Sequence, residues 1–452
     1  MATSLKEEAR SLTEKEARDS GERLQHSHLS DTSVSVPARR ICVIGLGYIG
    51  LPTASLLASR GYKVHGVDVC EEVISIINAG DIHIQEPELD IVVRSAVESK
   101  RLKADTKPAP ADIFILSVPT PFKGEHEPDL TYVESATRTM AAVLKEGDLV
   151  ILESTSPVGT TEKMAAWLAE ERPDLAHGRD DNGNDHCPGV LLAHCPERVL
   201  PGQIMRELIE NDRIVGGVND ASTNAAVAFY KTFVTGEVLA TDARTAEMSK
   251  LAENTFRDIN IAYANELSII CDKLGMDVWE LIRLANHHPR VNILQPGAGV
   301  GGHCIAVDPW FIVSQVPDEA RLIRAARAVN DCKPAWVVEQ IMSRLQGRGT
   351  VACLGLSFKP DVDDLRESPA LEVASMLAED PALNLLVVEP YVDKLPTPLA
   401  SRANVKLMSL TEAVEESDLV ISLVRHRDFC SNAEMIRDAN PEFLDFVNIL
   451  GR

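Results

Sequence analysis

The sequence lacks the features of several protein classes. No run of about 18 apolar residues occurs in its 452 residues, so we expect no membrane-spanning helix. A basic surplus is also missing, because 68 acidic residues against 45 Lys plus Arg give a formal charge of −23. Such a charge repels nucleic acid and anionic membrane surfaces. We therefore expect neither as a partner, and a phosphate-bearing ligand must meet a local site.

Paired cysteines are missing as well. The nine cysteines include no CxxC pair, and residues 1–38 contain neither the apolar segment nor the cleavage site of a secretory signal. This pattern favours a reducing compartment, the cytoplasm, over structural disulfides. His287, His288 and His303 have no second cluster at metal-ligand spacing, so we expect no metal site.

The order of apolar runs predicts an α/β protein with two Rossmann-like, doubly wound parallel-sheet domains joined by a central helical domain. The first domain begins with a strand, glycine turn, helix and strand over 40–69, and apolar runs follow at 113–118, 149–154 and 190–195. A second series of strands begins near Gly349. The predicted divisions are a mobile polar tail (1–38), a first Rossmann domain (39–240), a helical domain (241–345) and a second Rossmann-like domain (346–452).

The helical domain is predicted to contain one long helix. Residues 244–274 contain the helical pattern without a proline or glycine interruption until Gly275, a length of about 45 Å at about 1.5 Å per residue. Its many apolar positions need another surface to cover them. We therefore expect a homodimer or a higher homo-oligomer.

A glycine-rich turn follows the first predicted strand. Gly45, Gly47 and Gly50 form GxGxxG between that strand and a helix, where missing side chains allow a pyrophosphate to approach the helix N-terminus. Asp68 ends the next strand, where a carboxylate binds both ribose hydroxyls and repels a 2′-phosphate. These features favour NAD over NADP. The alternative is a Rossmann-like domain whose glycine turn binds no dinucleotide.

A second glycine-rich stretch, GAGVGGHCIAVDPW over 297–310, leads to a cysteine. So many glycines indicate backbone packed against a ligand. Asp308 followed by Pro309 reads as an N-cap with proline at the first helical position, and this places Cys304 just ahead of a helix N-terminus whose field favours a thiolate. The alternative is that Cys304 is a small buried hydrophobic residue and Asp308 only a cap.

Lys250 and Asn254 lie four residues apart on the long predicted helix and so share one face. Nearby apolar residues would partly desolvate the lysine and suit it to proton transfer or to stabilising an alkoxide. The alternative is a solvated helix face on which Lys250 pairs with Glu247.

Two further polar loops follow predicted strands, at the edge where ligands bind in this architecture. Thr155 lies in STSPVGTT and could orient a water, and Glu197 lies in CPERV and could act as a base for hydrolysis. The alternative assigns the first loop to turn formation and makes Glu197 an exposed carboxylate.

Together these motifs resemble the UDP-glucose/GDP-mannose dehydrogenase family from about Arg40 to Arg452. The resemblance rests on GLGYIGLP, SVPTP, STSPVGTT, CPERVLPG, the Lys250/Asn254 helix, GGHCIAVDP and GLSFKPDVDDLRESPA, in the family's order. Within the family, HPRVNILQPGAGVGGHCIAVDPWF resembles the members that oxidise UDP-N-acetyl-D-mannosamine.

The resemblance implies a role for each matching residue. The implied catalytic residues are the nucleophile Cys304, Lys250 with Asn254, the base Glu197, and Thr155 with Asp308, which orient water. The implied NAD-binding residues are Gly45, Gly47, Tyr48, Ile49, Gly50, Asp68, Pro119, Thr120 and Thr155, and the implied substrate-binding residues are Arg198, Val199, Lys250, Asn254, Arg290, Gly301, Lys359 and Arg366. Many UDP-glucose members have a second acidic residue four positions beyond the base, where this chain has Pro201.

The resemblance also implies the reaction, a four-electron, NAD-dependent oxidation of a UDP-sugar primary alcohol to a uronate through a Cys304 thiohemiacetal and thioester. The expected substrate is UDP-N-acetyl-D-mannosamine, with UDP-N-acetylglucosamine or UDP-glucose as alternatives. Two other classes remain open: a two-electron hydroxyacid dehydrogenase, which yields one NADH and needs no nucleophile, and an NAD-responsive binding protein.

Overall fold

The computed structural model describes residues 39–124, 126–175, 189–302, 304–345, 348–439 and 442–451. The tail predicted over 1–38 lies outside these residues, as does His303, one of the three histidines that we do not expect to bind a metal. None of the helices in the described ranges is both long enough and apolar enough to cross a bilayer.

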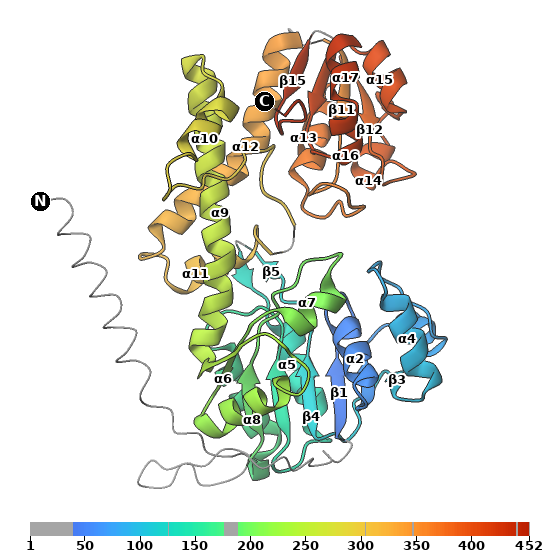
Figure 1. The fold of residues 1–452 in the computed structure, drawn as a ribbon, viewed down its shortest axis with the longest axis vertical. Coiled ribbons are helices and arrows are strands. Elements are labelled where there is room, and N and C mark those ends of the chain that lie inside the picture. The colour runs from blue at the N-terminus through green and yellow to red at the C-terminus, as the bar shows by residue number, and fades with distance from the viewer. Residues whose placement is uncertain are drawn as a thin grey trace, which may run out of the picture. The chain divides into compact units, whose positions relative to one another are not determined.

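The N-terminal part of the described chain is built on an eight-stranded sheet with the order β10-β9-β8-β7-β4-β1-β2-β3 (Figure 1). Its strands are β1 (Arg40–Ile44), β2 (Lys63–Val67), β3 (Leu102–Asp105), β4 (Ile113–Leu116), β7 (Leu149–Leu152), β8 (Leu191–His194), β9 (Arg213–Gly217) and β10 (Val238–Asp242). All neighbouring strands pair in parallel except β8 and β9. Counted from one edge of the sheet, the six strands β3-β2-β1-β4-β7-β8 therefore have the strand order of a dinucleotide-binding Rossmann fold.

Helices cover this sheet because its strands are apolar on both faces. On β1, Ile41 and Val43 pack into one core cluster, whereas Cys42 and Ile44 pack into another. The covering helices are α2 (Gly50–Ser59), α3 (Glu71–Asn78), α4 (Leu89–Glu98), α5 (Thr131–Ala141), α6 (Thr160–Glu171), α7 (Ile204–Glu210) and α8 (Asp220–Tyr230). A short hairpin of β5 (Phe122–Lys123) and β6 (Glu127–Pro128) follows β4, and a 3-10 turn, η1, spans Pro173–Leu175.

The long helix predicted over 244–274 is confirmed as α9 (Ala243–Leu274). Its N-cap is Asp242, whose carboxylate accepts a hydrogen bond from the Thr245 amide, and its C-cap is Gly275 in the left-handed conformation. The other helices of this region are α10 (Val278–Ala285), α11 (Asp308–Gln315) and α12 (Arg321–Leu345). A buried ion pair of 2.6 Å between Arg327 and Asp258 joins α12 to α9.

The C-terminal part has a second, entirely parallel sheet with the order β13-β12-β11-β14-β15. Its strands are β11 (Gly349–Leu354), β12 (Leu383–Val388), β13 (Val405–Leu407), β14 (Leu419–Ser422) and β15 (Phe443–Asp445), and its helices are α13 (Pro369–Ala378), α14 (Thr397–Ala400), α15 (Leu410–Glu416), α16 (Arg427–Ser431) and α17 (Ala433–Ala439). The predicted fold class, two Rossmann-like sheets with a helical region between them in the chain, is thus confirmed.

Candidate active site

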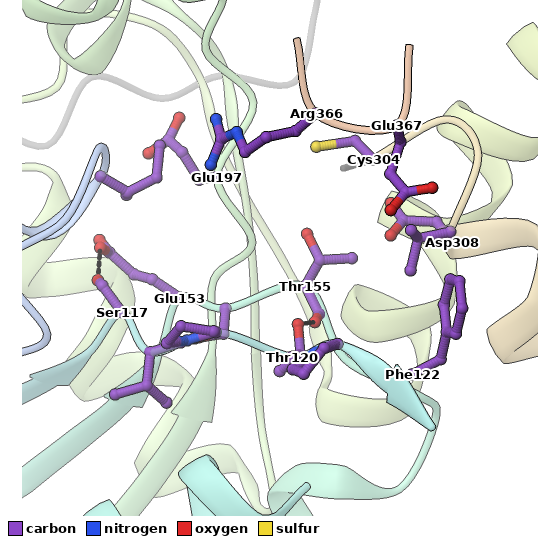
Figure 2. Close-up of a pocket in the computed structure, with 16 residues that line it drawn as sticks. Ser117, Thr120, Phe122, Glu153, Thr155, Glu197, Cys304, Asp308, Arg366 and Glu367 are labelled. Carbon is purple, nitrogen blue, oxygen red and sulfur yellow. Dashed lines mark hydrogen bonds between the residues drawn. The ribbon is translucent and has the colours of Figure 1, made fainter. Parts of the chain in front are cut away.

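A cavity of about 550 Å³ lies at the carboxyl ends of β4 and β7, a size and a place typical of ligand sites in this architecture. Residues that follow β4, β7 and β8 form one side, and Cys304, Val307, Asp308, Arg366 and Glu367 also line it. In Figure 2, Cys304, Asp308 and Glu367 lie on one side of the view and Ser117 and Glu153 on the other, with Thr155 between them. The cavity therefore brings together loops that are far apart in the sequence.

The glycine turn after β1 is shaped for a dinucleotide. Gly45 has a φ of +90°, and an added Cβ would lie 2.4 Å from the Ser117 carbonyl oxygen; at Gly50 it would lie 1.8 Å from the Gly45 oxygen. Around Gly47, by contrast, a Cβ would meet no atom within 4 Å. Gly45 and Gly50 are therefore needed by the turn itself, whereas Gly47 leaves open space ahead of α2, where a pyrophosphate needs it.

The predicted NAD-binding residues outside the glycines lie around this turn and the cavity. Asp68 follows β2, and its carboxylate accepts hydrogen bonds of 3.0 Å from the Leu46 and Cys70 amides. The cavity is lined by Ile49, Pro119, Thr120 and Thr155. Thr120 Oγ1 donates to the Thr155 carbonyl at 2.6 Å. Tyr48 is exposed, and its ring centroid lies 5.6 Å from the guanidinium carbon of Arg366. These residues fit NAD, and their individual roles stay a prediction.

Cys304 lies in a turn that leads into α11, as predicted, and the Asp308 amide donates to its carbonyl oxygen at 2.9 Å. The predicted N-cap is wrong, because Val307 occupies that position and Asp308 is the first residue of the helix. The predicted preference for a thiolate is also wrong. Desolvation, followed by the Asp308 carboxyl, raises the pKa of Cys304, although Lys250, Arg366 and Lys359 act in the opposite direction. An acidic residue in the first turn offsets the field of the helix terminus.

Asp308 is one of three buried carboxyls that line the cavity. Burial raises its pKa to about 7, against the effects of a hydrogen bond from Asn254 and of the nearby Lys250 charge. The Asn254 amide donates to Asp308 Oδ2. Lys250 and Asn254 do not line this cavity in the described chain, but Asn254 bonds Asp308 and the Lys250 charge acts on Asp308 and Cys304. Glu247 does not pair with Lys250 as the alternative proposed, since its buried carboxylate accepts from Thr161 and the Gly159 amide.

Glu197 is buried rather than exposed, so the alternative reading of this residue is wrong. Its side chain is 7% exposed, and its Oε2 lies 2.8 Å from Nη1 of Arg213, which is 1% exposed. Sequence reasoning missed Arg213, and it also missed Glu153, a fully buried carboxyl that lines the same cavity. An acidic residue that directly follows the apolar run LVIL was a signal for Glu153.

Three of the four glycines before Cys304 pack closely against protein, so the ligand that we expected is not needed to explain them. An added Cβ would lie 2.7 Å from Pro369 at Gly299, 2.1 Å from the Glu367 oxygen at Gly301, and 2.8 Å from Phe358 at Gly302. These glycines therefore admit the loop between β11 and α13. That loop also brings Arg366 and Glu367 to the cavity.

The remaining predicted substrate residues lie outside the wall of this cavity in the described chain. Arg198 is half-buried and pairs with Glu253 at 2.8 Å, and Val199 packs against the N-terminal core. Lys359 lies beside the ring of Phe358. Arg290 is exposed in the segment after α10. Their roles stay predictions.

The fold and the cavity define an NAD-linked dehydrogenase: a Rossmann sheet with an open glycine turn, beside a pocket that holds a thiol and buried carboxyls. Models of the UDP-glucose/GDP-mannose dehydrogenase family match the NAD binding domain at residues 39–234, the central domain at 244–332 and the UDP binding domain at 352–452. The chain belongs to this family.

Relatives and solved structures agree with this assignment. UDP-N-acetyl-D-mannosamine dehydrogenase of Campylobacter jejuni is 59% identical over 86% of this chain and 96% of its own length. NDP-N-acetyl-D-galactosaminuronic acid dehydrogenase of Ralstonia nicotianae is 53% identical, over 88% and 93%. The structure of UDP-D-ManNAc dehydrogenase from Pyrococcus horikoshii has a TM-score of 0.79 and 40% identity, over 91% of this chain and 96% of that one.

Proposed function

We propose that this chain oxidises the primary alcohol of UDP-N-acetyl-D-mannosamine to the carboxylate of UDP-N-acetyl-D-mannosaminuronate, with two NAD consumed per sugar. The observation that carries the proposal is the presence of Cys304, Asp308, Glu197 and Thr155 in one cavity beside the glycine turn. A two-electron dehydrogenase needs an acid–base group but no thiol at the reacting carbon.

In the first oxidation, NAD would be held by the turn around Gly47 and by the loops after β4 and β7, and it would supply the hydride acceptor. Lys250 and Asn254 stabilise the oxyanion that develops on the alcohol oxygen, together with a water held by Asp308. The Asn254 amide donates to the Asp308 carboxyl and so fixes its orientation. The alcohol becomes an aldehyde that stays in the cavity.

In the second oxidation, the Cys304 sulfur adds to the aldehyde carbon and forms a thiohemiacetal. A second NAD would accept the hydride that the thiohemiacetal loses, which would leave a thioester on Cys304. Water positioned by Thr155 and deprotonated by Glu197 then attacks the thioester carbonyl, and the uronate leaves. Because the intermediate stays covalently bound, no free aldehyde is released.

The nucleotide end of the substrate is proposed to lie against the C-terminal part of the chain, which matches the family's UDP binding domain. Lys359 and Arg366 supply positive charge for the diphosphate, and Gly301, Arg198 and Val199 complete the sugar site. Arg290, which is exposed in this chain, is proposed to reach the substrate of a second subunit.

We propose a homodimer formed along α9. The side chains of Phe256, Tyr263 and Leu274 are 70%, 50% and 65% exposed on this helix, a costly arrangement for a free surface. Phe256→Asp should convert the dimer to a monomer in sedimentation experiments. A dimer that withstands this change and Tyr263→Asp together would refute this interface. We also propose a cytoplasmic enzyme whose uronic acid product is used in surface polysaccharides.

The ratio of NADH to uronate tests the proposed chemistry. Two NADH per uronate are expected, whereas one NADH and a free oxidised product would support a two-electron hydroxyacid dehydrogenase. Cys304→Ser should abolish uronate formation while the protein still binds NAD. Full turnover by that variant would overturn the covalent mechanism. In an enzyme site, bound UDP-sugar should protect Cys304 from an alkylating reagent. An NAD-responsive binding protein should show no such protection.

A substrate panel tests the sugar. Turnover should be fastest with UDP-N-acetyl-D-mannosamine, compared with UDP-N-acetylglucosamine, UDP-N-acetylgalactosamine, UDP-glucose and GDP-mannose. UDP-N-acetylgalactosamine is the second candidate, because of the 53% identical Ralstonia relative. A higher kcat/KM with any other sugar would move the assignment to that sugar.

A further inference from the structure

A second buried carboxyl, Glu153, lies at the cavity beside Glu197 and has no role in the mechanism above. It directly follows β7 and is 2% exposed. Its Oε2 accepts from Ser117 Oγ at 2.9 Å, the contact dashed in Figure 2, and its Oε1 accepts from the Tyr230 hydroxyl at 3.0 Å. Both donors are neutral hydroxyls, so neither balances a negative charge on Glu153.

The Arg213 guanidinium is the positive charge next to both carboxyls, Glu197 and Glu153. Arg213 binds Glu197 directly, and Glu197 and Arg213 are the charged groups that act on Glu153 among the described residues. The other titratable neighbours are neutral near pH 7, since burial raises the pKa of Cys195 to about 12 and that of Tyr230 well above its usual range. With both carboxyls ionised, the cluster would hold two negative charges against one positive charge.

The cluster therefore has a place for one proton, because an unbalanced charge is costly in a buried site. Burial, and then the charge on Glu197, raise the pKa of Glu153 to about 7. Glu153 is thus the member of the pair that holds this proton near neutrality, and Glu197 is the member that pairs with Arg213.

The reaction releases protons that the cavity must accept, an argument that rests on the proposed function. An alcohol, two NAD⁺ and one water give a carboxylate, two NADH and three protons. One proton leaves at each oxidation. In hydrolysis, water adds to the thioester carbon, the carbon–sulfur bond breaks, and the two protons of water go to the Cys304 sulfur and to an acceptor. The raised pKa of Cys304 keeps the first proton on sulfur.

We propose that Glu153 is a positioning residue for the hydrolytic step, which acts through Glu197. When Glu197 takes the proton of the attacking water, Glu153 releases its own proton into the cavity that it lines and becomes the negative partner of Arg213. The charge of the buried cluster then stays constant while one proton passes to solvent. Glu153 thereby supplies the second carboxyl that Pro201 cannot provide four positions beyond Glu197.

Glu153→Gln tests this inference, because glutamine keeps the size of the side chain but releases no proton. In a single turnover with UDP-N-acetyl-D-mannosamine and NAD, we expect both NADH to form at nearly the native rate. Hydrolysis should then be slower by about tenfold or more, within the range of general-base effects. The Cys304 peptide should carry the sugar thioester after an acid quench, and the pH dependence of hydrolysis near pH 7 should flatten.

Two further variants separate charge from packing. Glu153→Asp keeps an ionisable carboxyl and should retain the pH dependence, also if Glu153→Gln fails to fold. Tyr230→Phe removes a hydrogen bond but no charge and should retain it as well. A native pH profile without thioester accumulation in Glu153→Gln, or a flattened profile in Tyr230→Phe, would overturn the inference. If the native enzyme itself gives one NADH per sugar, the proposed function fails, whatever the variants show.

Discussion

The pair of Arg213 and Glu197 makes a strong prediction about stability. Arg213→Met fills a similar volume but leaves the Glu197 carboxylate without its partner at 2.8 Å, at a site where the two side chains are 1% and 7% exposed. Removing one member of a buried ion pair costs about 3–5 kcal/mol. The nearby Glu153 and the lost hydrogen bond to the Leu208 carbonyl place the expected loss toward the upper end.

Urea unfolding at pH 8 measures this loss, and a double variant identifies its cause. Glu197→Gln combined with Arg213→Met removes the unpaired charge, so the double variant should regain at least half of the lost free energy of unfolding. Arg138→Met is the surface control, since Arg138 pairs with three carboxylates that are partly open to water, and it should change the stability much less. If Arg213→Met is as stable as this control, or the double variant no more stable than Arg213→Met, the buried-pair reasoning is refuted.

Three other perturbations test separate parts of the molecule. The added methyl group of Gly47→Ala meets no atom within 4 Å, so the free energy of unfolding should stay native. The dissociation constant of NAD, measured by calorimetry, should rise by about tenfold or more, which corresponds to about 1.4 kcal/mol of binding free energy. NAD binding as tight as in the native protein would contradict the pyrophosphate site. Asp308→Asn removes the second cause of the raised pKa of Cys304, and iodoacetamide should then alkylate Cys304 faster at pH 8; an unchanged rate would show that Asp308 does not act on the thiol. Burial lowers the pKa of Lys333 from 10.5 to about 7, so the unfolded chain binds more protons between these values and native stability should rise with pH across that window. Lys333→Met should abolish this rise and stabilise the protein below pH 7, by up to about 5 kcal/mol, and a variant with the native pH slope would refute the assignment.

The lysine prediction depends on which of two opposing effects is larger. The Lys333 ammonium lies 3.7 Å from the centroid of the Trp336 ring, which favours the charged form by about 2 kcal/mol in a desolvated site. The Asp272 charge also favours the charged form, but burial of the ammonium is the larger effect and costs several kcal/mol. Desolvation therefore prevails. Replacing the lysine leaves its neighbour Ser268 satisfied, because the Ser268 hydroxyl still donates a hydrogen bond to the Asn265 carbonyl oxygen.

The fold was predictable from sequence where its signals are local. The turn from β1 into α2 has its apolar strand, its glycines and its helix within 20 residues, and α9 ends at Gly275, where the sequence pattern ends. The strands β9 and β10 were missed for a physical reason. Arg213 begins the first and Thr241 and Asp242 end the second. These polar residues interrupt the apolar run that predicts a buried strand, so the two strands become evident only from their pairing in the sheet.

The predicted site residues that the cavity brings together, Cys304, Thr155, Glu197 and Asp308, were visible because each follows a strand or precedes a helix. Glu153 also follows a strand and had such a signal, but neither its role nor that of Arg213 could be predicted, because both depend on the Glu197 carboxylate that the sheet brings to them from another strand. For the same reason the ionisation of Cys304 was predicted with the wrong sign. Sequence showed the helix that follows the thiol, but not the desolvation of this exposed cysteine by the cavity that it lines or the contribution of Asp308.

In the proposed mechanism, the raised pKa of Cys304 would suit a nucleophile that is needed only after the first oxidation. A permanent thiolate would be a reactive charge beside the alcohol and the cofactor while neither yet requires it. Lys250, Arg366 and Lys359 act in the opposite direction to Asp308, so the balance at the sulfur depends on how these charges are engaged. A diphosphate bound by Arg366 and Lys359 would weaken the lowering effect of these two charges on the pKa of the thiol. When the sulfur adds to the aldehyde, the aldehyde oxygen needs a proton. A protonated thiol supplies that proton, and the buried carboxyls remain available to take the protons that each later step releases.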